Sequence, residues 1–310
     1  MNEFFTSAIL TATIASGIQL AVPFLLAALG ETIGQRSGVL NLGVDGIMLL
    51  GAFTSYYVAL KTGDLPLAVL AGLAVGVACG LATAFISVTL RAEQGISGIG
   101  VYLFALGLTS LLFLKLVGTP LPIEQPGKVE VPYLHELPLV GETLFRQDAL
   151  VYLAFALVPI VTFVLNRTTF GLNVRAVGEN PAAADSLGVS VARTRYVTVT
   201  IGSSLAGLAG ATLMIDVGIF QQNITNAVGF IAIALVYFGA WRPIGVMLGA
   251  LLYGMTQALV LSWKGLGIIP VSLSDLAAAT PAVITVLALL TVARRFRQPA
   301  ALAMPYTRGG

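Results

Sequence analysis

Few residues of this 310-residue chain have the type and spacing that enzymatic chemistry requires. The single histidine, His135, lies in a proline-rich polar stretch, which excludes Ser-His-Asp and Cys-His nucleophile arrangements and any multi-histidine metal site. No G-x-x-x-x-G-K-[ST] loop occurs, so the chain cannot hold the phosphates of ATP by itself. Cys79 is the only cysteine, and an internal disulfide is therefore impossible. We expect no catalytic residue, no metal ligand and no cofactor bound by this chain.

Two polar stretches interrupt otherwise apolar sequence. Residues 38–46, GVLNLGVDG, contain Asn41 and Asp45, and residues 216–226 contain several polar groups. Non-helical backbone persists at membrane depth only where protein or a watery cavity satisfies it, and an intramembrane carboxylate is a functional candidate. The alternative for Asp45 is that it caps a helix starting at Gly46, a role that suits aspartate. We predict broken helices here, with either role open for Asp45.

The elements that must position these residues are apolar. Hydrophobic residues make up 57% of the chain, charged residues 10%, and the mean hydropathy is +0.94. Such a composition requires lipid as the main solvent, and runs of about 20 apolar residues are long enough to span it. Continuous runs, rather than alternation, exclude a β-barrel. The sequence predicts an all-α, polytopic transmembrane helical bundle with about nine spanning helices (8–10), some broken, at 5–29, 38–60, 65–90, 96–117, 148–166, 196–216, 224–241, 243–263 and 276–293.

Basic residues predict the orientation, because Lys and Arg are retained on the cytoplasmic side. With nine spans and the N-terminus outside, eleven arginines fall on one side, and five basic residues, including every lysine, fall on the other. We expect a cytoplasmic C-terminus. No basic patch with interleaved aromatic residues occurs, so nucleic acid is not an expected partner.

Small residues at helical spacing predict close helix contacts, since interhelical packing in lipid depends on them. The three stripes are Gly72, Gly76 and Gly80; Gly202, Ala206 and Gly210; and Gly245 and Gly249. Packing within the chain is the favoured interpretation, and a contact between subunits is the alternative.

Residues 1–310 are expected to form a single transmembrane domain with two long connections. The outer one, 118–147, contains five prolines and is either a cap over the bundle or a mere tether. The inner one, 167–195, encodes a helix of about two turns, with Asn180 as N-cap, Pro181 at the first helical position and Gly188 at the C-terminus. So short a helix must dock on its own bundle or on another subunit.

The sequence resembles the permeases of bacterial ATP-binding cassette importers of the branched-chain amino acid, ribose and nucleoside type. Four segments carry the resemblance: GQRSGVLNLGVDGIMLLGAF at 34–53, the loop 167–195 around ENPAAADSLG, ALVYFGAWRPIGVMLGALLYG at 234–254, and the tail from Pro299 to Tyr306. It is most similar to the shorter permease of nucleoside or simple-sugar systems. The chain departs from the family at Asp45, where Glu is usual, and near Phe104, where an Asn is expected.

The resemblance implies a multi-pass protein of the bacterial cytoplasmic membrane that pairs with a second permease, an ATPase that uses ATP, and an extracytoplasmic solute-binding lipoprotein. It implies that the inner loop meets the ATPase, through Arg175, Glu179, Asn180, Pro181, Ala182, Ala183, Ala184 and Gly188. The broken segment and the departures suggest a translocation path near Asn41, Asp45 and Phe104. The expected solute is a nucleoside, then a sugar, then an amino acid. A self-contained secondary transporter is the alternative, and an intramembrane enzyme is less favoured still.

Overall fold

A computed structural model describes residues 7–130, 140–292 and 297–307. These residues are mostly helical, with one short antiparallel pair of strands, β1 (Val129–Glu130) and β2 (Arg146–Gln147). The helices are α1 (Ser7–Arg36), α2 (Val44–Thr62), α3 (Leu65–Ala84) with a π-helical turn at Phe85–Thr89, α4 (Gln94–Leu116), α5 (Val140–Leu144), α6 (Ala149–Arg167), α7 (Thr169–Glu179), α8 (Pro181–Ser186), α9 (Val191–Val217), α10 (Val228–Phe238), α11 (Pro243–Gly265), a 3₁₀ turn at Val271–Leu273, and α12 (Ser274–Val292).

Six helices of the described chain are long and apolar enough to cross a membrane: α1, α3, α4, α6, α9 and α11. The apolar stretches of α10 (Val228–Phe238) and α12 (Ser274–Ala288) are shorter. The structure therefore supports a helical membrane bundle but does not confirm the expectation of about nine spans. The expected spans at 38–60 and 224–241 correspond to α2 and α10, each preceded by irregular backbone that shortens the helix.

The first helix is longer than the sequence predicts. We expected it to end near residue 29 because the following residues are polar, yet α1 continues to Arg36. Buried hydrogen bonds satisfy these polar groups: Gln35 Nε2 donates to Glu31 at 3.2 Å, and Trp241 Nε1 donates to Gln35 Oε1 at 2.9 Å. Polar side chains paired in this way remain inside a helix bundle at little cost. The partner Trp241 is distant in sequence, and the local pattern could not reveal it.

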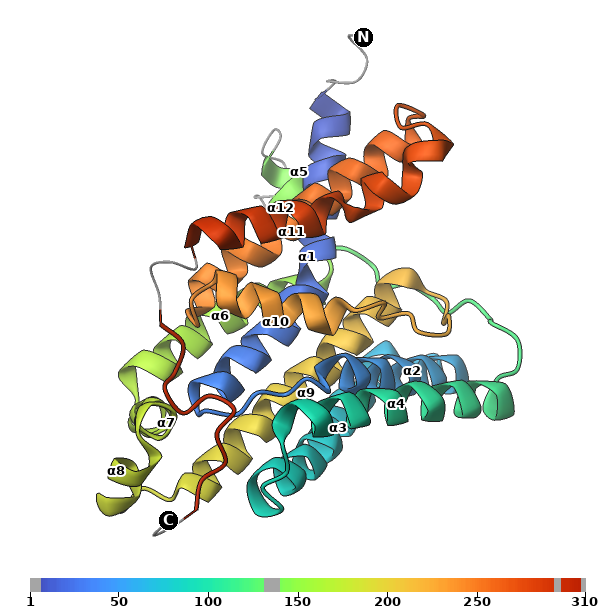
Figure 1. The fold of residues 1–310 in the computed structure, drawn as a ribbon. Coiled ribbons are helices and arrows are strands. Elements are labelled where there is room, and N and C mark those ends of the chain that lie inside the picture. The colour runs from blue at the N-terminus through green and yellow to red at the C-terminus, as the bar shows by residue number, and fades with distance from the viewer. Residues whose placement is uncertain (1–6, 131–139, 293–296, 308–310) are drawn as a thin grey trace.

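Helix α9 runs through the middle of the bundle and packs on α1, α2 and α3, as Figure 1 shows. Small residues set these distances. A Cβ built on Gly76 would lie 2.5 Å from the Ser203 carbonyl oxygen, and one on Gly202 would lie 2.7 Å from the Gly30 carbonyl oxygen. The stripe at Gly245 packs in the same way against Gly239. All three small-residue stripes thus serve contacts within the chain, as the favoured interpretation predicted.

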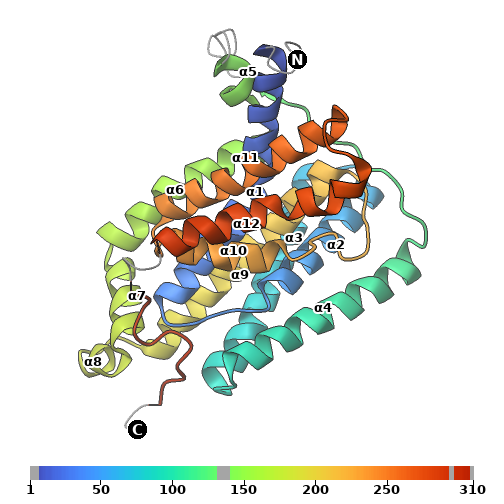
Figure 2. The same ribbon diagram turned by 45° about the horizontal axis from the view of Figure 1, so that its top comes forward.

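The two ends of the bundle differ. Helices α7 and α8 and the C-terminal tail lie at one end, whereas α5 and the first turns of α1 lie at the other (Figures 1 and 2). The described part of the 118–147 connection contacts helix ends: Ile123 N donates to Gly218 O at 2.8 Å, and Tyr56 Oη donates to Leu121 O at 2.8 Å. These bonds favour a cap over a tether. His135 lies outside the described residues.

Candidate functional site

A cavity of about 570 Å³ opens between α1, α9, α10, α11 and the loop that joins α9 to α10. We call it the polar chamber. Its polar lining includes Gln19, Asp216, Thr225, Asn226 and Gln257, and its aromatic lining is Phe24 and Tyr253. The volume falls within the range of small-molecule sites, and an apolar wall with a few convergent polar groups is typical of such sites.

The chamber offers hydrogen-bonding groups in two places. On one side, Gln19 Nε2 donates to Asp148 Oδ2 at 2.9 Å and to Asp216 Oδ1 at 3.3 Å. On the other, Gln257 Oε1 is buried and has no partner among the described residues. A buried amide oxygen without a donor is unfavourable, so a ligand hydroxyl or amino group there would be stabilised.

The geometry of α1 adds to this arrangement. Pro23 lies inside α1 and lines the chamber. Since proline lacks an N–H, the carbonyl of Gln19, four residues earlier, has no intrahelical donor. The rings of Phe24 and Tyr253 lie nearby with centroids 4.5 Å apart. Aromatic faces of this kind stack on planar or apolar faces of a ligand.

Asp148, which holds Gln19, is the N-cap residue of α6 and lies just before its membrane-spanning segment. Burial raises the pKa of this carboxyl above its ordinary value, and the charge of Lys128 opposes the rise. Asp148 does not itself line the chamber, but its carboxylate accepts the hydrogen bond from Gln19 and so holds the Gln19 side chain in position at the chamber wall.

Asp45 caps a helix other than its own. The helix α2 begins at Val44, and its N-cap residue Gly43 has no side-chain cap. The Asp45 carboxylate is fully buried and accepts hydrogen bonds from the Gly229 N–H at 2.7 Å and the Thr225 hydroxyl at 3.0 Å. Gly229 stands in the first turn of α10, which lacks a side-chain cap of its own.

The expectation that Asp45 caps a helix starting at Gly46 is therefore wrong in its target: the carboxylate caps α10 across the fold. This requires close approach, because a Cβ on Gly229 would lie 2.5 Å from the Asp45 Cα atom. Asp45 does not line the polar chamber, but it holds Thr225, which does.

The other two residues predicted for the path lie apart. Asn41 is buried, and its Oδ1 accepts from Gly43 N at 3.0 Å in the turn before α2. Phe104 is 65% exposed on α4. The neighbouring Val101 faces the turn instead, since a Cβ on Gly43 would lie 2.9 Å from it. In the structure Asn41 and Asp45 lie close together at the start of α2, whereas Phe104 lies on the exposed surface of α4. The part of all three residues in translocation stays a prediction.

Asp216, Thr225 and Asn226 fall in the polar stretch 216–226 that the sequence analysis singled out, but the analysis missed the chamber residues of α1 and α11. Gln19 and Gln257 are uncharged polar residues within apolar runs, and Pro23 is a proline within the first run. These features were visible in the sequence. Nothing in their spacing indicates that α1 and α11 meet, however, and their convergence is a tertiary result.

The inner connection contains two helices, α7 and α8. The short α8 has the predicted local structure: Asn180 Oδ1 accepts from Ala183 N at 3.0 Å, Pro181 occupies the first turn, and Gly188 has φ +86°. The longer α7, which includes Arg175 and Glu179, was not predicted.

Helix α8 has an inner and an outer face. Ala184 is buried with Val177 and Val191 in a small apolar cluster, whereas Ala182, Ala183 and Leu187 are exposed. The segment thus docks on its own chain through Ala184 and presents the other side outward.

The C-terminal tail fixes this end of the molecule. Ala301 N donates to Gly178 O at 2.8 Å, Ala303 N donates to Gly38 O at 3.0 Å, and Arg195 Nη1 donates to Met304 O at 2.9 Å. These bonds join the end of α7, the turn after α1 and the start of α9. The tail therefore ties the end of α7 to the start of the central helix α9.

Comparison with known proteins adds to this geometry. Residues 13–292 match the profile of the family described as branched-chain amino acid transport system permease component. The chain is 41% identical to the putative glucose ABC transporter permease protein TsgC13 of Haloferax volcanii, over 85% of this chain and 80% of that protein.

Two further relatives are named for nucleosides. The chain is 34% identical to the guanosine ABC transporter permease protein NupQ of Bacillus subtilis, over 97% of this chain and 98% of that protein. It is 35% identical to the nucleoside ABC transporter permease protein NupC of Lactococcus lactis subsp. cremoris, over 79% of this chain and 81% of that protein. No solved structure matches the chain.

Proposed function

Because the chain belongs to the family of branched-chain amino acid transport system permease components, we propose that its polar chamber passes a nucleoside or a simple sugar across the membrane. The chain is a permease subunit of an ATP-binding cassette importer, as its relatives are. The observation that supports the solute class is the lining of the chamber, which combines uncharged hydrogen-bonding side chains with two aromatic rings.

The charge of the residues that line the polar chamber discriminates between the possible solutes. None of the described residues that line the chamber is Lys or Arg, whereas Asp216 is acidic. The carboxylate of an amino acid would have no cationic partner there, and burying an unpaired charge is costly. Nucleosides and sugars are neutral, and their hydroxyl groups match Gln257 and the Gln19 carbonyl. The Phe24 and Tyr253 rings favour a solute with a flat face, and thus a nucleoside over a sugar.

The partners follow from the family. We propose that α8 seats on a separate ATPase subunit through its exposed face, with Ala182 and Ala183 permitting close approach. A second, related permease would complete the membrane portion. Bacillus subtilis NupP, named as a guanosine ABC transporter permease protein like NupQ, is 26% identical to this chain. An extracytoplasmic solute-binding lipoprotein would deliver the solute.

The proposed orientation places α7 and α8 in the cytoplasm and α5 outside, on the basis of the eleven basic residues against five. In this arrangement α2, α10 and α12 complete nine membrane segments, the first two as broken helices. An impermeant thiol reagent applied to intact cells should modify a cysteine placed at Lys264 and spare one at Arg167. The reverse labelling would contradict both the orientation and the ATPase contact.

The solute proposal is tested by uptake of labelled guanosine, glucose and leucine into proteoliposomes that contain the complete importer. Tyr253→Leu and Gln257→Leu should reduce guanosine uptake at least tenfold, since each loses a contact of about 1.4 kcal/mol. Trp263→Leu is the matched control, because Trp263 is an exposed aromatic residue on the same helix that does not line the chamber. Equal losses in all three variants would contradict the chamber assignment.

The same vesicles separate an importer from a self-contained secondary transporter. Uptake should require both the ATPase subunit and ATP, and the permease alone should be inactive. Uptake by this chain alone, driven by an ion gradient, would overturn the role of the partners.

A further inference from the structure

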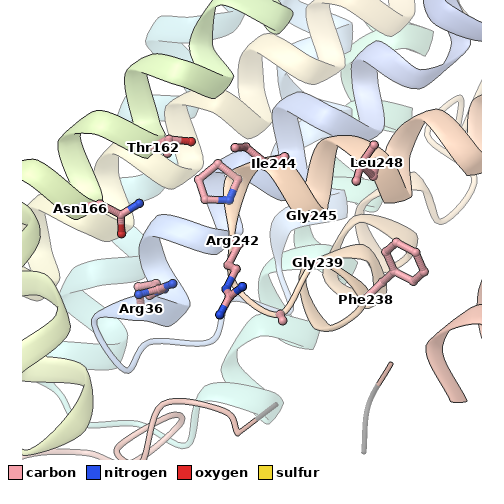
Figure 3. A pocket seen from close by; sticks show the side chains of 11 residues that line it. Arg36, Thr162, Asn166, Phe238, Gly239, Arg242, Ile244, Gly245 and Leu248 are labelled. Atoms are coloured by element: carbon pink, nitrogen blue, oxygen red, sulfur yellow. The ribbon is translucent and has the colours of Figure 1, made fainter. Parts of the chain in front are cut away.

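We propose that a second cleft, on the surface of the bundle near α7, binds the headgroup of an anionic phospholipid. The cleft has a volume of about 560 Å³ and lies between the end of α6, the end of α1 and the turn from α10 to α11 (Figure 3). Its lining includes Arg36, Arg242, Thr162, Asn166, Ile244 and Leu248. None of these residues lines the polar chamber, so the two sites are separate.

The charge of the cleft is positive. Figure 3 shows the Arg36 and Arg242 side chains at the same end of the cleft. Repulsion from Arg175 and Arg242 and attraction from Glu179 act on the Arg36 guanidinium. Among the described residues that line the cleft, none is Asp or Glu. Arginine pairs in such a setting recognise phosphate through charge-assisted hydrogen bonds.

The backbone around the cleft also favours the binding of an anion. Arg36 Nε donates to the Trp241 carbonyl at 2.9 Å, which holds the guanidinium beside the α10–α11 turn. Helix α11 starts at Pro243 without a side-chain cap, and Ile244 and Gly245 of its first turn line the cleft. The positive end of this 23-residue helix therefore adds to the two arginines in attracting an anion.

The apolar part of the cleft indicates a lipid rather than a free anion. Ile244 is 53% exposed and Leu248 is 56% exposed, and both belong to a helix apolar enough to cross the membrane. Helices α1, α6 and α10 all end beside the cleft and α11 begins there, so the arginines lie where the apolar spans stop. A lipid with its phosphate at the arginines and its acyl chains along Leu248 would match both the charged part and the apolar part of the cleft. Basic pockets between transmembrane helices bind anionic headgroups in this way.

The test is retention of phosphatidylglycerol by the purified importer, measured by native mass spectrometry after reconstitution in vesicles of phosphatidylcholine with phosphatidylglycerol. Arg242→Gln should lower the retained phosphatidylglycerol about fivefold, the effect of one basic residue at an anionic surface. Phosphatidylcholine retention should not change. Arg167→Gln is the matched control, because Arg167 is an exposed arginine at the end of α6 that does not line the cleft.

Further variants distinguish among the possible occupants of the cleft. Leu248→Gln should also weaken phosphatidylglycerol retention, because the acyl chains would lie along Leu248; unchanged retention would place those chains elsewhere and would overturn the assignment of the lipid to this cleft. Equal retention in the wild type and Arg242→Gln would refute the proposal, as would an equal loss in Arg167→Gln. Loss of the second permease from purified Arg242→Gln would show a subunit interface in place of a lipid site. The melting temperature of each variant reports folding independently, and none of these readouts depends on the solute carried.

Discussion

Asp45 gives the sharpest test of the structure, because replacing it separates capping from a role for its charge. In the Asp45→Leu variant, the Gly229 N–H and the Thr225 hydroxyl lose their acceptor inside the bundle. Each unsatisfied buried group costs about 1–3 kcal/mol, so the variant should lose about 2–6 kcal/mol of stability. Asp45→Asn keeps an acceptor oxygen for Gly229 and can donate to Thr225, so its loss should be near 1 kcal/mol.

The assay is thermal unfolding of the purified protein in detergent, with the amount of inserted protein as a second readout. Asp64→Leu is the control, because Asp64 caps α3 at the exposed surface, through Leu67 N at 3.0 Å, and its loss should cost about 1 kcal/mol. We expect the melting temperature to fall most in Asp45→Leu. A melting temperature of Asp45→Leu equal to that of the wild type would refute the capping contact. Normal stability in Asp45→Asn with abolished uptake would instead show that the charge serves the solute.

Three other predictions use the purified permease or, where ATP hydrolysis is measured, the complete importer. Ala183→Glu, on the exposed face of α8, should leave insertion and the melting temperature unchanged but abolish solute-stimulated ATP hydrolysis. Ala184→Glu should instead destabilise the fold, since Ala184 is buried. Wild-type hydrolysis in Ala183→Glu would contradict the proposed contact between α8 and the ATPase. Gly210→Ala should lower the melting temperature by the equivalent of about 1–3 kcal/mol of unfolding free energy, because the new Cβ would overlap the Met48 carbonyl. An unchanged melting temperature would contradict the packing of α9 on α2. Hydrogen bonds from the backbone N–H groups of Ile96 and Gly95 hold the pKa of Glu93 below its ordinary value, so its stabilising contribution is present above that value and is lost as the pH falls through the lowered pKa. Glu93→Gln should make stability less dependent on acid pH, and identical pH profiles would refute the cap.

Local structure was predictable where neighbouring residues carry the whole signal. The cap of α8 involves Asn180 and Ala183, three positions apart, and its left-handed end requires only Gly188. Such interactions are complete within one or two helical turns, and residue type alone indicates them. The small-residue stripes were readable for the same reason, because one face of a single helix displays them.

Predictions failed where the partner is distant. The end of α1 was placed too early because Gln35 pairs with Trp241, 206 positions away. The target of Asp45 was missed because Gly229 is 184 positions away. The sequence analysis noticed Asp45 as an unusual polar residue but did not notice Gln35. The hydrogen-bond partner of each residue, and hence its role, depends on which helices pack together.

The sequence by itself determined that this chain is a helical membrane protein of a permease family, because composition, run length and motifs are properties of the chain order alone. Only the tertiary structure decided which residues line the proposed solute chamber and the proposed lipid cleft. The polar chamber joins Gln19, Asp216 and Gln257 from three helices, and the second cleft joins Arg36 at the end of α1 with Arg242 in the turn before α11. The physical reason is that a binding site is a convergence of side chains in space, and helix packing, set here by glycine contacts around α9, fixes which side chains converge.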